Sequence, residues 1–195
     1  MHHSQYVLRR NPMSAGRRFA QAGFSLYDFI ITSAVASVLG TGAVSMTDLV
    51  KDTRITTNVN QLMAELSLAR SEAIKRHTLV TLCTSSDGAS CSHDDNWQAG
   101  WIMFINDDGD NKVDAGETII RVQPPLEGNL TLRYGGEKES FSRVTYHPPG
   151  YARQNATFTF CDTRGSSKGK AVIINTIGRA YVSTKTWEGN PLKCT

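Results

Sequence analysis

Acidic side chains are concentrated in one short segment, where Asn106-Asp107-Asp108-Gly109-Asp110 is followed by Asp114 and Glu117. Together they offer enough oxygen atoms for calcium, which takes about 6–8 of them. The spacing fails the EF-hand template, because Phe104 stands at the first ligand position when Gly109 is placed at the turn. The segment therefore predicts a β-turn lined by solvated acids, and we expect no metal site.

The segment Gly165-Ser166-Ser167-Lys168-Gly169 has the GxSxG spacing of a nucleophile elbow. Such an elbow needs a His downstream, and His147 is the last His of the chain. The same glycines fail the phosphate-loop pattern, which has four residues between the glycines and Ser or Thr after the Lys. No HExxH spacing occurs either. We expect a flexible hairpin loop here, and a chain that is not an enzyme and needs no cofactor.

The four cysteines Cys83, Cys91, Cys161 and Cys194 allow three disulfide pairings. Cys83 and Cys91 flank a turn-rich loop, and a bridge from Cys161 to Cys194 would hold the end of the chain. We therefore expect the local pairing, 83–91 and 161–194. Neither pair has the CxxC spacing of a zinc or thioredoxin-like site, and an even number of cysteines suits an oxidising compartment such as a periplasm.

Basic residues dominate the end of the chain. The net charge of all 195 residues is +3, but residues 84–127 hold nine acidic residues against two basic ones, and residues 128–195 hold ten basic against four acidic ones. The basic residues of the last 43 positions are Arg153, Arg164, Lys168, Lys170, Arg179, Lys185 and Lys193. They could contact phosphates in a sequence-independent, salt-sensitive way. The alternative is a set of solvated surface charges.

An uncharged run, Phe29–Thr47, lies between Asp28 and Asp48 and precedes all of these residues. As a helix with a rise of ~1.5 Å per residue it would reach roughly 28 Å, close to the ~30 Å hydrocarbon core of a bilayer. It can be interpreted as a transmembrane anchor, as a cleaved signal with Arg17-Arg18 as a twin-arginine motif, or as a buried helix of a soluble core. The acid-free leader, residues 1–23, carries four arginines, which disfavours the buried helix because positive charge marks the cytoplasmic side of a membrane segment.

Beyond this run, apolar residues recur at steps of three and four. They are Ile55, Val59, Leu62, Met63, Leu66, Ala69, Ala73 and Ile74. Because no Pro or Gly interrupts this second pattern, the chain predicts one long helix with an apolar first half and an amphipathic second half. That continuity disfavours cleavage after the apolar run.

Short β-branched and aromatic runs alternate with turn residues from Leu79 onward, which is typical of strands in antiparallel sheets. The expected strands are 79–83, 101–105, 118–122, 130–134, 143–147, 157–161, 171–175 and 179–183. We expect their sheets to pack against the amphipathic half of the helix.

The start of the apolar run carries a family resemblance. Gly23-Phe24-Ser25-Leu26-Tyr27-Asp28 resembles the class III signal of type IV pilins and type II secretion pseudopilins. The resemblance implies that a prepilin peptidase cuts between Gly23 and Phe24 and methylates Phe24. It also implies that Asp28, at a position where the family usually has Glu, pairs with the cationic N-terminus of a neighbouring subunit. The alternative for Asp28 is a helix-start acid that faces the macrodipole and does nothing more.

The rest of the chain is similar to the GspH/FimT family of type IV minor pilins and type II secretion pseudopilins. The residues that carry this similarity are 69–73 with Arg76, 80–83, Trp97 with Gly100-Trp101, 107–109 with 114–117, 157–165, and Gly178-Arg179. The resemblance implies an α+β, pilin-like fold in which a long N-terminal helix packs on an antiparallel β-rich head. Its expected parts are a cleaved leader 1–23, a transmembrane half 24–50, an amphipathic half 51–77 and a periplasmic head 78–195.

The function that this resemblance implies is that of a minor pilin or pseudopilin, which helps to initiate or cap a type IV pilus or a type II secretion pseudopilus. The implied location is the inner membrane, with a single pass, and then the filament. The implied partners are other pilins or pseudopilins and prepilin peptidase. A soluble exported β-domain with a twin-arginine signal is one alternative.

The other alternative is a DNA-binding minor pilin for natural transformation. DNA-binding members of the FimT type carry a Gly-Arg-x-Arg motif, and this chain has Gly178-Arg179-Ala180-Tyr181 at the matching place. Tyr181 therefore replaces the second Arg, although its ring could stack on a base. The candidate DNA-binding residues are Arg164, Lys168, Lys170, Arg179 and Tyr181.

Overall fold

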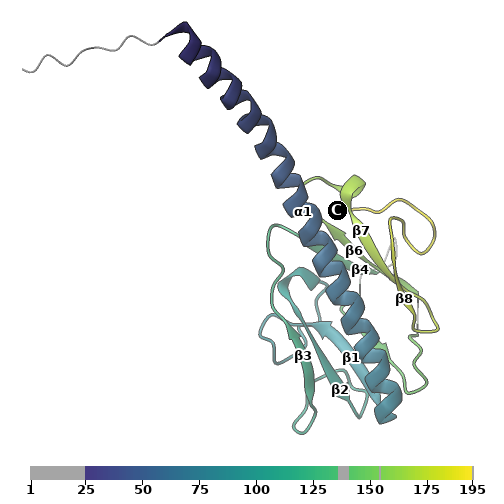
Figure 1. Cartoon of the computed structure of the whole chain (residues 1–195). Helices are drawn as coiled ribbons and strands as arrows, with labels where there is room; N and C mark the ends of the chain where they lie inside the picture. Colours follow the sequence, from purple (N-terminus) through teal and green to yellow (C-terminus); the bar gives the residue numbers. More distant parts are fainter. Residues whose placement is uncertain (1–24, 136–140, 154, 195) are drawn as a thin grey trace, which may run out of the picture. The chain divides into compact units, whose positions relative to one another are not determined.

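The structure is a computed structural model of the chain and describes residues 25–135, 141–153 and 155–194 (Figure 1). The side chains of residues 38–45 are outside the described part as well. The leader 1–23 and the expected cleavage site, Gly23-Phe24, lie outside these ranges. Clustering of contacts divides the chain into two units, 1–43 and 44–195, and each is described by itself.

One helix, α1, runs from Leu26 to Arg76, as the continuous pattern predicted. It ends where His77 adopts a left-handed conformation with φ of 56°, a common way to stop a helix. Lys75 and Arg76 place positive charge in the last turn, where the helix dipole favours it. Among the described residues, no helix meets the length and mean hydropathy of a membrane span.

The second half of α1 buries the expected apolar stripe. Ile55, Val59, Leu62, Leu66, Ala69 and Ala73 are all at most 1% exposed. Two members of the predicted stripe differ, because Met63 is only partly buried and Ile74 remains 43% exposed. Ile74 is exposed because it borders an open groove, described below.

Within the described residues, eight strands form two antiparallel sheets. The first sheet has the order β3-β2-β1-β5 and is built from β1 (Leu79–Thr84), β2 (Trp101–Asn106), β3 (Ile119–Gln123) and β5 (Arg143–Tyr146). The second has the order β4-β6-β7-β8 and is built from β4 (Thr131–Gly135), β6 (Ala156–Cys161), β7 (Lys170–Ile174) and β8 (Ala180–Ser183). Each predicted strand is present, with bounds that differ by one residue at most. The α+β, pilin-like fold class is thereby confirmed.

The main core lies where the second half of α1 crosses both sheets (Figure 1). Trp97, in the short 3-10 helix Trp97–Ala99 between β1 and β2, lies at its centre and is fully buried. A smaller cluster, formed by Cys83, Ile102 and Phe104, covers the other face of the first sheet. Because both faces are covered, all six residues of β2 are buried.

Candidate functional site

Asp28 lies in the first turn of α1, where it takes part in a capping arrangement. The Ser25 amide donates to Asp28 Oδ2 over 3.3 Å, and Ser25 Oγ accepts a hydrogen bond from the Tyr27 amide over 3.3 Å. This reciprocal pattern satisfies amides that a helix start leaves unpaired. Asp28 is exposed, and it forms no ion pair with any residue that the structure describes. Its carboxylate therefore has a local role, and pairing with a neighbouring subunit stays a prediction.

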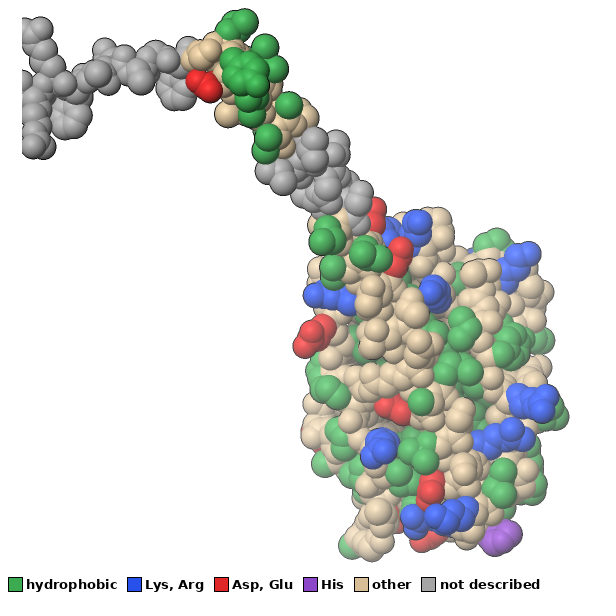
Figure 2. Space-filling model, in the orientation of Figure 1, with side chains coloured by type: hydrophobic (Ala, Val, Ile, Leu, Met, Phe, Trp, Pro, Cys, Tyr) green, Lys and Arg blue, Asp and Glu red, His purple; other side chains and the backbone are tan. Residues whose placement is uncertain are grey.

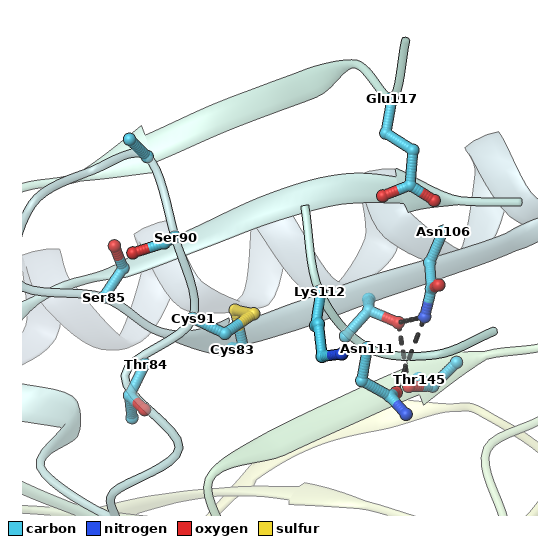
Figure 3. The surroundings of a disulfide bond; sticks show 12 residues. Cys83, Thr84, Ser85, Ser90, Cys91, Asn106, Asn111, Lys112, Glu117 and Thr145 are labelled. Atoms are coloured by element: carbon cyan, nitrogen blue, oxygen red, sulfur yellow. Dashed lines mark hydrogen bonds between the residues drawn. A yellow bond between two sulfur atoms is a disulfide. The ribbon is translucent and has the colours of Figure 1, made fainter. Parts of the chain in front are cut away.

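Two disulfides are present, and they follow the local pairing expected from the sequence. Cys83–Cys91 closes a short loop beside the first sheet (Figure 3). Within that loop, Asp87 accepts hydrogen bonds from Ser90 Oγ, the amides of Ala89 and Ser90, and Ser85 Oγ. These bonds hold the pKa of Asp87 well below its usual range. Cys161–Cys194 ties the C-terminal segment to β6, next to the buried Leu192.

Arg164, one of the candidate DNA-binding residues, is held by three carboxylates. Its guanidinium lies 2.7 Å from Asp162 Oδ2, 2.8 Å from Asp52 Oδ1 and 3.7 Å from Asp48 Oδ1. Its side chain is only 14% exposed. The hydrogen bonds from Arg164 lower the pKa of Asp162. Since Asp48 and Asp52 belong to α1, Arg164 fastens the turn after β6 to the helix.

Lys170 and Lys51 make the same connection. Lys170 Nζ donates to Thr56 Oγ1 of α1 over 2.8 Å, and Lys51 Nζ of α1 donates to Thr163 Oγ1 over 3.2 Å. Arg164 is therefore paired with carboxylates within the protein, and Lys170 uses one of its donors on Thr56. Between them, residues 166–168 form a 3-10 turn, so the segment expected to be a flexible loop contains a short helical turn.

The other three candidates, Lys168, Arg179 and Tyr181, are exposed. They do not form one site, because Lys168 and Arg179 lie at opposite ends of β7. Lys168 comes just before the first residue of β7. Arg179 comes just before Ala180, which pairs with Ile174, the last residue of β7. Figure 2 shows Lys and Arg side chains spread over the visible face of residues 44–195 instead of gathered in one patch. The structure thus leaves Arg164 and Lys170 bonded to other parts of the protein, with the exposed Lys168 and Arg179 at opposite ends of β7.

The role of Arg164 predicts a pH-dependent loss of stability. Because the pKa of Asp162 is below its unfolded value of ~3.9, the pair stabilises the fold above that pH, and the effect is lost as pH falls through the folded pKa. Arg164→Met is expected to lower the melting temperature by several degrees at pH 7 and by much less near pH 2. Thermal unfolding followed by circular dichroism measures both. The exposed neighbour Lys168→Met is the matched control, and an equal loss at both pH values for Arg164→Met would contradict the assignment.

The acidic segment between β2 and β3 folds as the expected turn. Asn106 Oδ1, Asp108 Oδ1 and Asp110 Oδ1 accept hydrogen bonds from backbone amides two or three residues later, and Glu117 accepts from the amides of Asp107 and Asp114. Asn106 also donates to Thr81. Figure 3 shows the side chains of Asn106 and Asn111 close together. Carboxylate oxygens of Asp108, Asp110 and Asp114 lie within 4.8 Å of one another, at exposed positions. The hydrogen bonds from backbone amides to these side chains hold the segment as a structured turn.

A groove of about 710 Å³ lies between α1 and the second sheet. Its lining residues are Leu66, Ser67, Arg70, Ser71, Ile74, Tyr146, Asn175, Gly178, Arg179, Ala180 and Tyr181. Arg70 Nε donates to the Gly150 carbonyl over 2.8 Å. The Tyr146 hydroxyl is buried and has no hydrogen-bond partner among the described residues. Sequence reasoning found Arg179 and Tyr181 of this set but not Tyr146, whose strand pattern gave no hint of an unpaired hydroxyl.

Glu65 is a further polar residue that sequence reasoning missed. It lies on α1 between Leu62 and Leu66 and is only 8% exposed. Trp101 Nε1 donates to Glu65 Oε2 over 2.6 Å, and Gln61 Nε2 donates to Glu65 Oε1 over 3.2 Å. Gln61 also contacts the Gln123 side chain. A carboxylate inside an apolar stripe was the available signal, and these donors explain how it is accommodated.

This chain is similar to a known protein family and to solved structures of other proteins. Residues 58–178 match the model of the family described as type II transport protein GspH. The type IV minor pilin FimU of Pseudomonas aeruginosa aligns with a TM-score of 0.54 at 19% identity, over 74% of this chain and 98% of FimU, which shows a shared fold. The minor pseudopilin EpsH of the type 2 secretion system of Vibrio cholerae aligns with a TM-score of 0.47 at 11% identity, over 67% and 96%. No curated protein matches the sequence.

Proposed function

Because the chain belongs to the family of the type II transport protein GspH, we propose that it is a minor subunit of a type IV pilus or of a type II secretion pseudopilus. Its role is to help initiate or cap the filament. Its first helix half is held in the inner membrane and then among the helices of other subunits, and its head, residues 78–195, lies in the periplasm. Prepilin peptidase is the enzyme that processes it.

The observation that carries this proposal is the apolar surface of the first part of α1. Large apolar side chains there are between 43% and 80% exposed, namely Leu26, Tyr27, Phe29, Ile30, Ile31 and Val35. An apolar surface of this kind calls for a partner that is itself apolar. Lipid and the helices of neighbouring subunits both fit that requirement.

Two alternatives receive less support. Cleavage after Ala43 or Ser45, as a twin-arginine signal would require, would cut inside α1 and discard part of a continuous helix. DNA uptake would be favoured by cations gathered on one surface, but Arg164 is paired with carboxylates, Lys170 donates to Thr56, and the exposed Lys168 and Arg179 lie at opposite ends of β7. We therefore do not extend the proposal to DNA.

The assembly role of Asp28 can be separated from its capping role by two substitutions. Asp28→Asn keeps an oxygen that can accept from the Ser25 amide but removes the charge, whereas Asp28→Glu keeps the charge. If Asp28 pairs with a cationic N-terminus, Asp28→Asn is expected to remain in the membrane fraction and to be reduced at least about tenfold in the sheared filament fraction, since a lost charge pair of ~1.4 kcal/mol is a factor of ten.

Quantitative immunoblotting of membrane and filament fractions measures this distribution in cells that carry the whole assembly system. Asp28→Glu, the charged control, is expected to assemble like the original chain. Normal assembly of Asp28→Asn would show that capping is the whole role of this carboxylate, and normal assembly of a chain without its apolar segment would contradict the proposed function.

A further inference from the structure

The groove beside α1 is lined on one side by residues of β8, which is an edge strand. β8 is the end strand of the second sheet, and it pairs only with β7 among the described residues. A strand edge carries backbone amides and carbonyls that can pair with an added strand. Tyr181 and Val182 of β8 are 47% and 48% exposed, and no described strand pairs with the outer edge of β8.

The charge of the groove is positive. Among the residues that the structure describes, Arg70 and Arg179 line it and no Asp or Glu does. Neither Arg forms an ion pair within the described part of the chain. Arg70 is oriented by its hydrogen bond to the Gly150 carbonyl, which uses only its Nε and leaves the two terminal nitrogens for another acceptor.

The backbone at Gly178, next to Arg179, lies against the backbone at Gly150. Gly178 has φ of +77°, and a Cβ atom at this position would collide with the Gly150 carbonyl oxygen, the acceptor of Arg70. Gly178 therefore permits the turn before β8 to lie against residue 150. The approach brings the segment of Arg179 next to the acceptor that orients Arg70.

Tyr146 adds an unpaired donor to the same groove. Its side chain is fully buried, and its hydroxyl lacks a hydrogen-bond partner among the described residues. A buried hydroxyl without a partner is costly in free energy, so a site of this kind gains from a ligand atom that accepts its proton. Tyr146 lines the groove together with the two arginines.

From these features we infer that the groove receives an extended acidic segment of a neighbouring subunit, which adds to the edge of β8 and places a carboxylate on Arg70 and Arg179. The inference rests on the proposed function for the source of the segment. Edge pairing supplies affinity in such complexes, and pockets or charges beside the edge supply specificity. A carboxylate fits the forked geometry of Arg and can also accept from the Tyr146 hydroxyl.

A peptide fits this groove better than a nucleic acid does. Single-stranded nucleic acids are bound by grooves with cations along the phosphate backbone. Here two cations line the groove among the described residues. Lys168 lies at the other end of β7, and Arg164 and Lys170 make contacts with other residues. The amides and carbonyls of the open strand edge match those of a peptide backbone and not a row of phosphates.

Fluorescence anisotropy with the full chain, purified in a mild detergent, tests the inference. The probe is a labelled peptide of alternating Val and Glu. One control peptide replaces each Glu with Lys, and another keeps the charges but is N-methylated at alternate residues, which blocks strand pairing. A short labelled oligothymidylate is the nucleic-acid arm.

The acidic peptide is expected to bind at least about tenfold more tightly than either control peptide and than the oligonucleotide. Arg179→Ala is expected to weaken its binding about tenfold, whereas Lys185→Ala, at an exposed cation just beyond the end of β8, is expected to leave it unchanged. Tyr146→Phe is expected to weaken binding severalfold without lowering the melting temperature, because the hydroxyl has no partner to lose within the described chain.

Equal binding of the acidic and basic peptides, or an Arg179→Ala chain that binds like the original, would overturn the inference. Tighter binding of the oligonucleotide would assign the groove to nucleic acid instead. If the acidic peptide does not bind but the original chain assembles normally in the cells of the Asp28 experiment, only the groove assignment is wrong. If the acidic peptide binds but the chain is neither processed nor assembled, the proposed function is wrong and the groove remains a peptide-binding site.

Discussion

Replacing Trp97 with Ala is expected to lower the free energy of unfolding by about 3–5 kcal/mol, the usual cost of removing a large buried aromatic side chain. Trp97 is fully buried, and its ring lies 4.9 Å from Phe158 and 5.6 Å from Tyr134, measured between centroids. Phe158 and Tyr134 belong to the second sheet, whereas Trp97 is in the connection between two strands of the first. The substitution therefore leaves a cavity where the two sheets meet.

The indole nitrogen adds a polar contribution to this effect. Trp97 Nε1 donates to the Phe141 carbonyl over 2.7 Å, and Trp97→Ala leaves that carbonyl without its donor. Trp97→Phe keeps much of the ring volume but loses the same donor, so its expected cost is about 1–3 kcal/mol. Trp187→Ala, at a Trp that is 43% exposed, is the control and is expected to change stability little.

Urea unfolding followed by circular dichroism, with both disulfides intact, measures all three variants. The expected order of destabilisation is Trp97→Ala, then Trp97→Phe, then Trp187→Ala. A Trp97→Ala chain as stable as the Trp187→Ala control would show that Trp97 does not join the two sheets.

The sequence predicts the elements of this fold well, because each carries a local signal. The three-and-four spacing from Ile55 to Ala73 marks the helix face that is buried, and Gly, Pro, Asn and Asp mark the ends of the strands. The local pairing of Cys83 with Cys91 follows from the short loop between them. These signals depend on neighbours in the sequence and need no knowledge of the tertiary arrangement.

Contacts between distant segments carry no such signal. Nothing local indicates that Arg164 meets Asp52, 112 positions earlier, or that Lys170 meets Thr56, and the sequence alone therefore presents both as candidate phosphate contacts. Likewise, the order β3-β2-β1-β5 and the assignment of β4 to the other sheet depend on how the whole chain packs. The groove beside β8 arises from that same packing, which brings Arg70 of α1 near Arg179.

The proposed processing of the N-terminus has the largest expected effect on the protein as a whole, since it would remove residues 1–23 and expose Phe24. The family usually has a glycine at the cut, and Gly23 is the matching residue. Gly23→Asp is therefore expected to abolish cleavage and filament entry while the uncut chain accumulates. Gly16→Asp, within the same leader, is the matched control and is expected to be processed normally.

Intact-mass analysis of the mature protein, extracted from membranes, tests the central claim most directly. A minor pilin or pseudopilin is expected to begin at Phe24, to carry one added methyl group on its N-terminal nitrogen and to retain the whole of α1, with both disulfides intact. A mature chain that begins after Ala43 or Ser45, or one released without methylation into the periplasm, would contradict the claim.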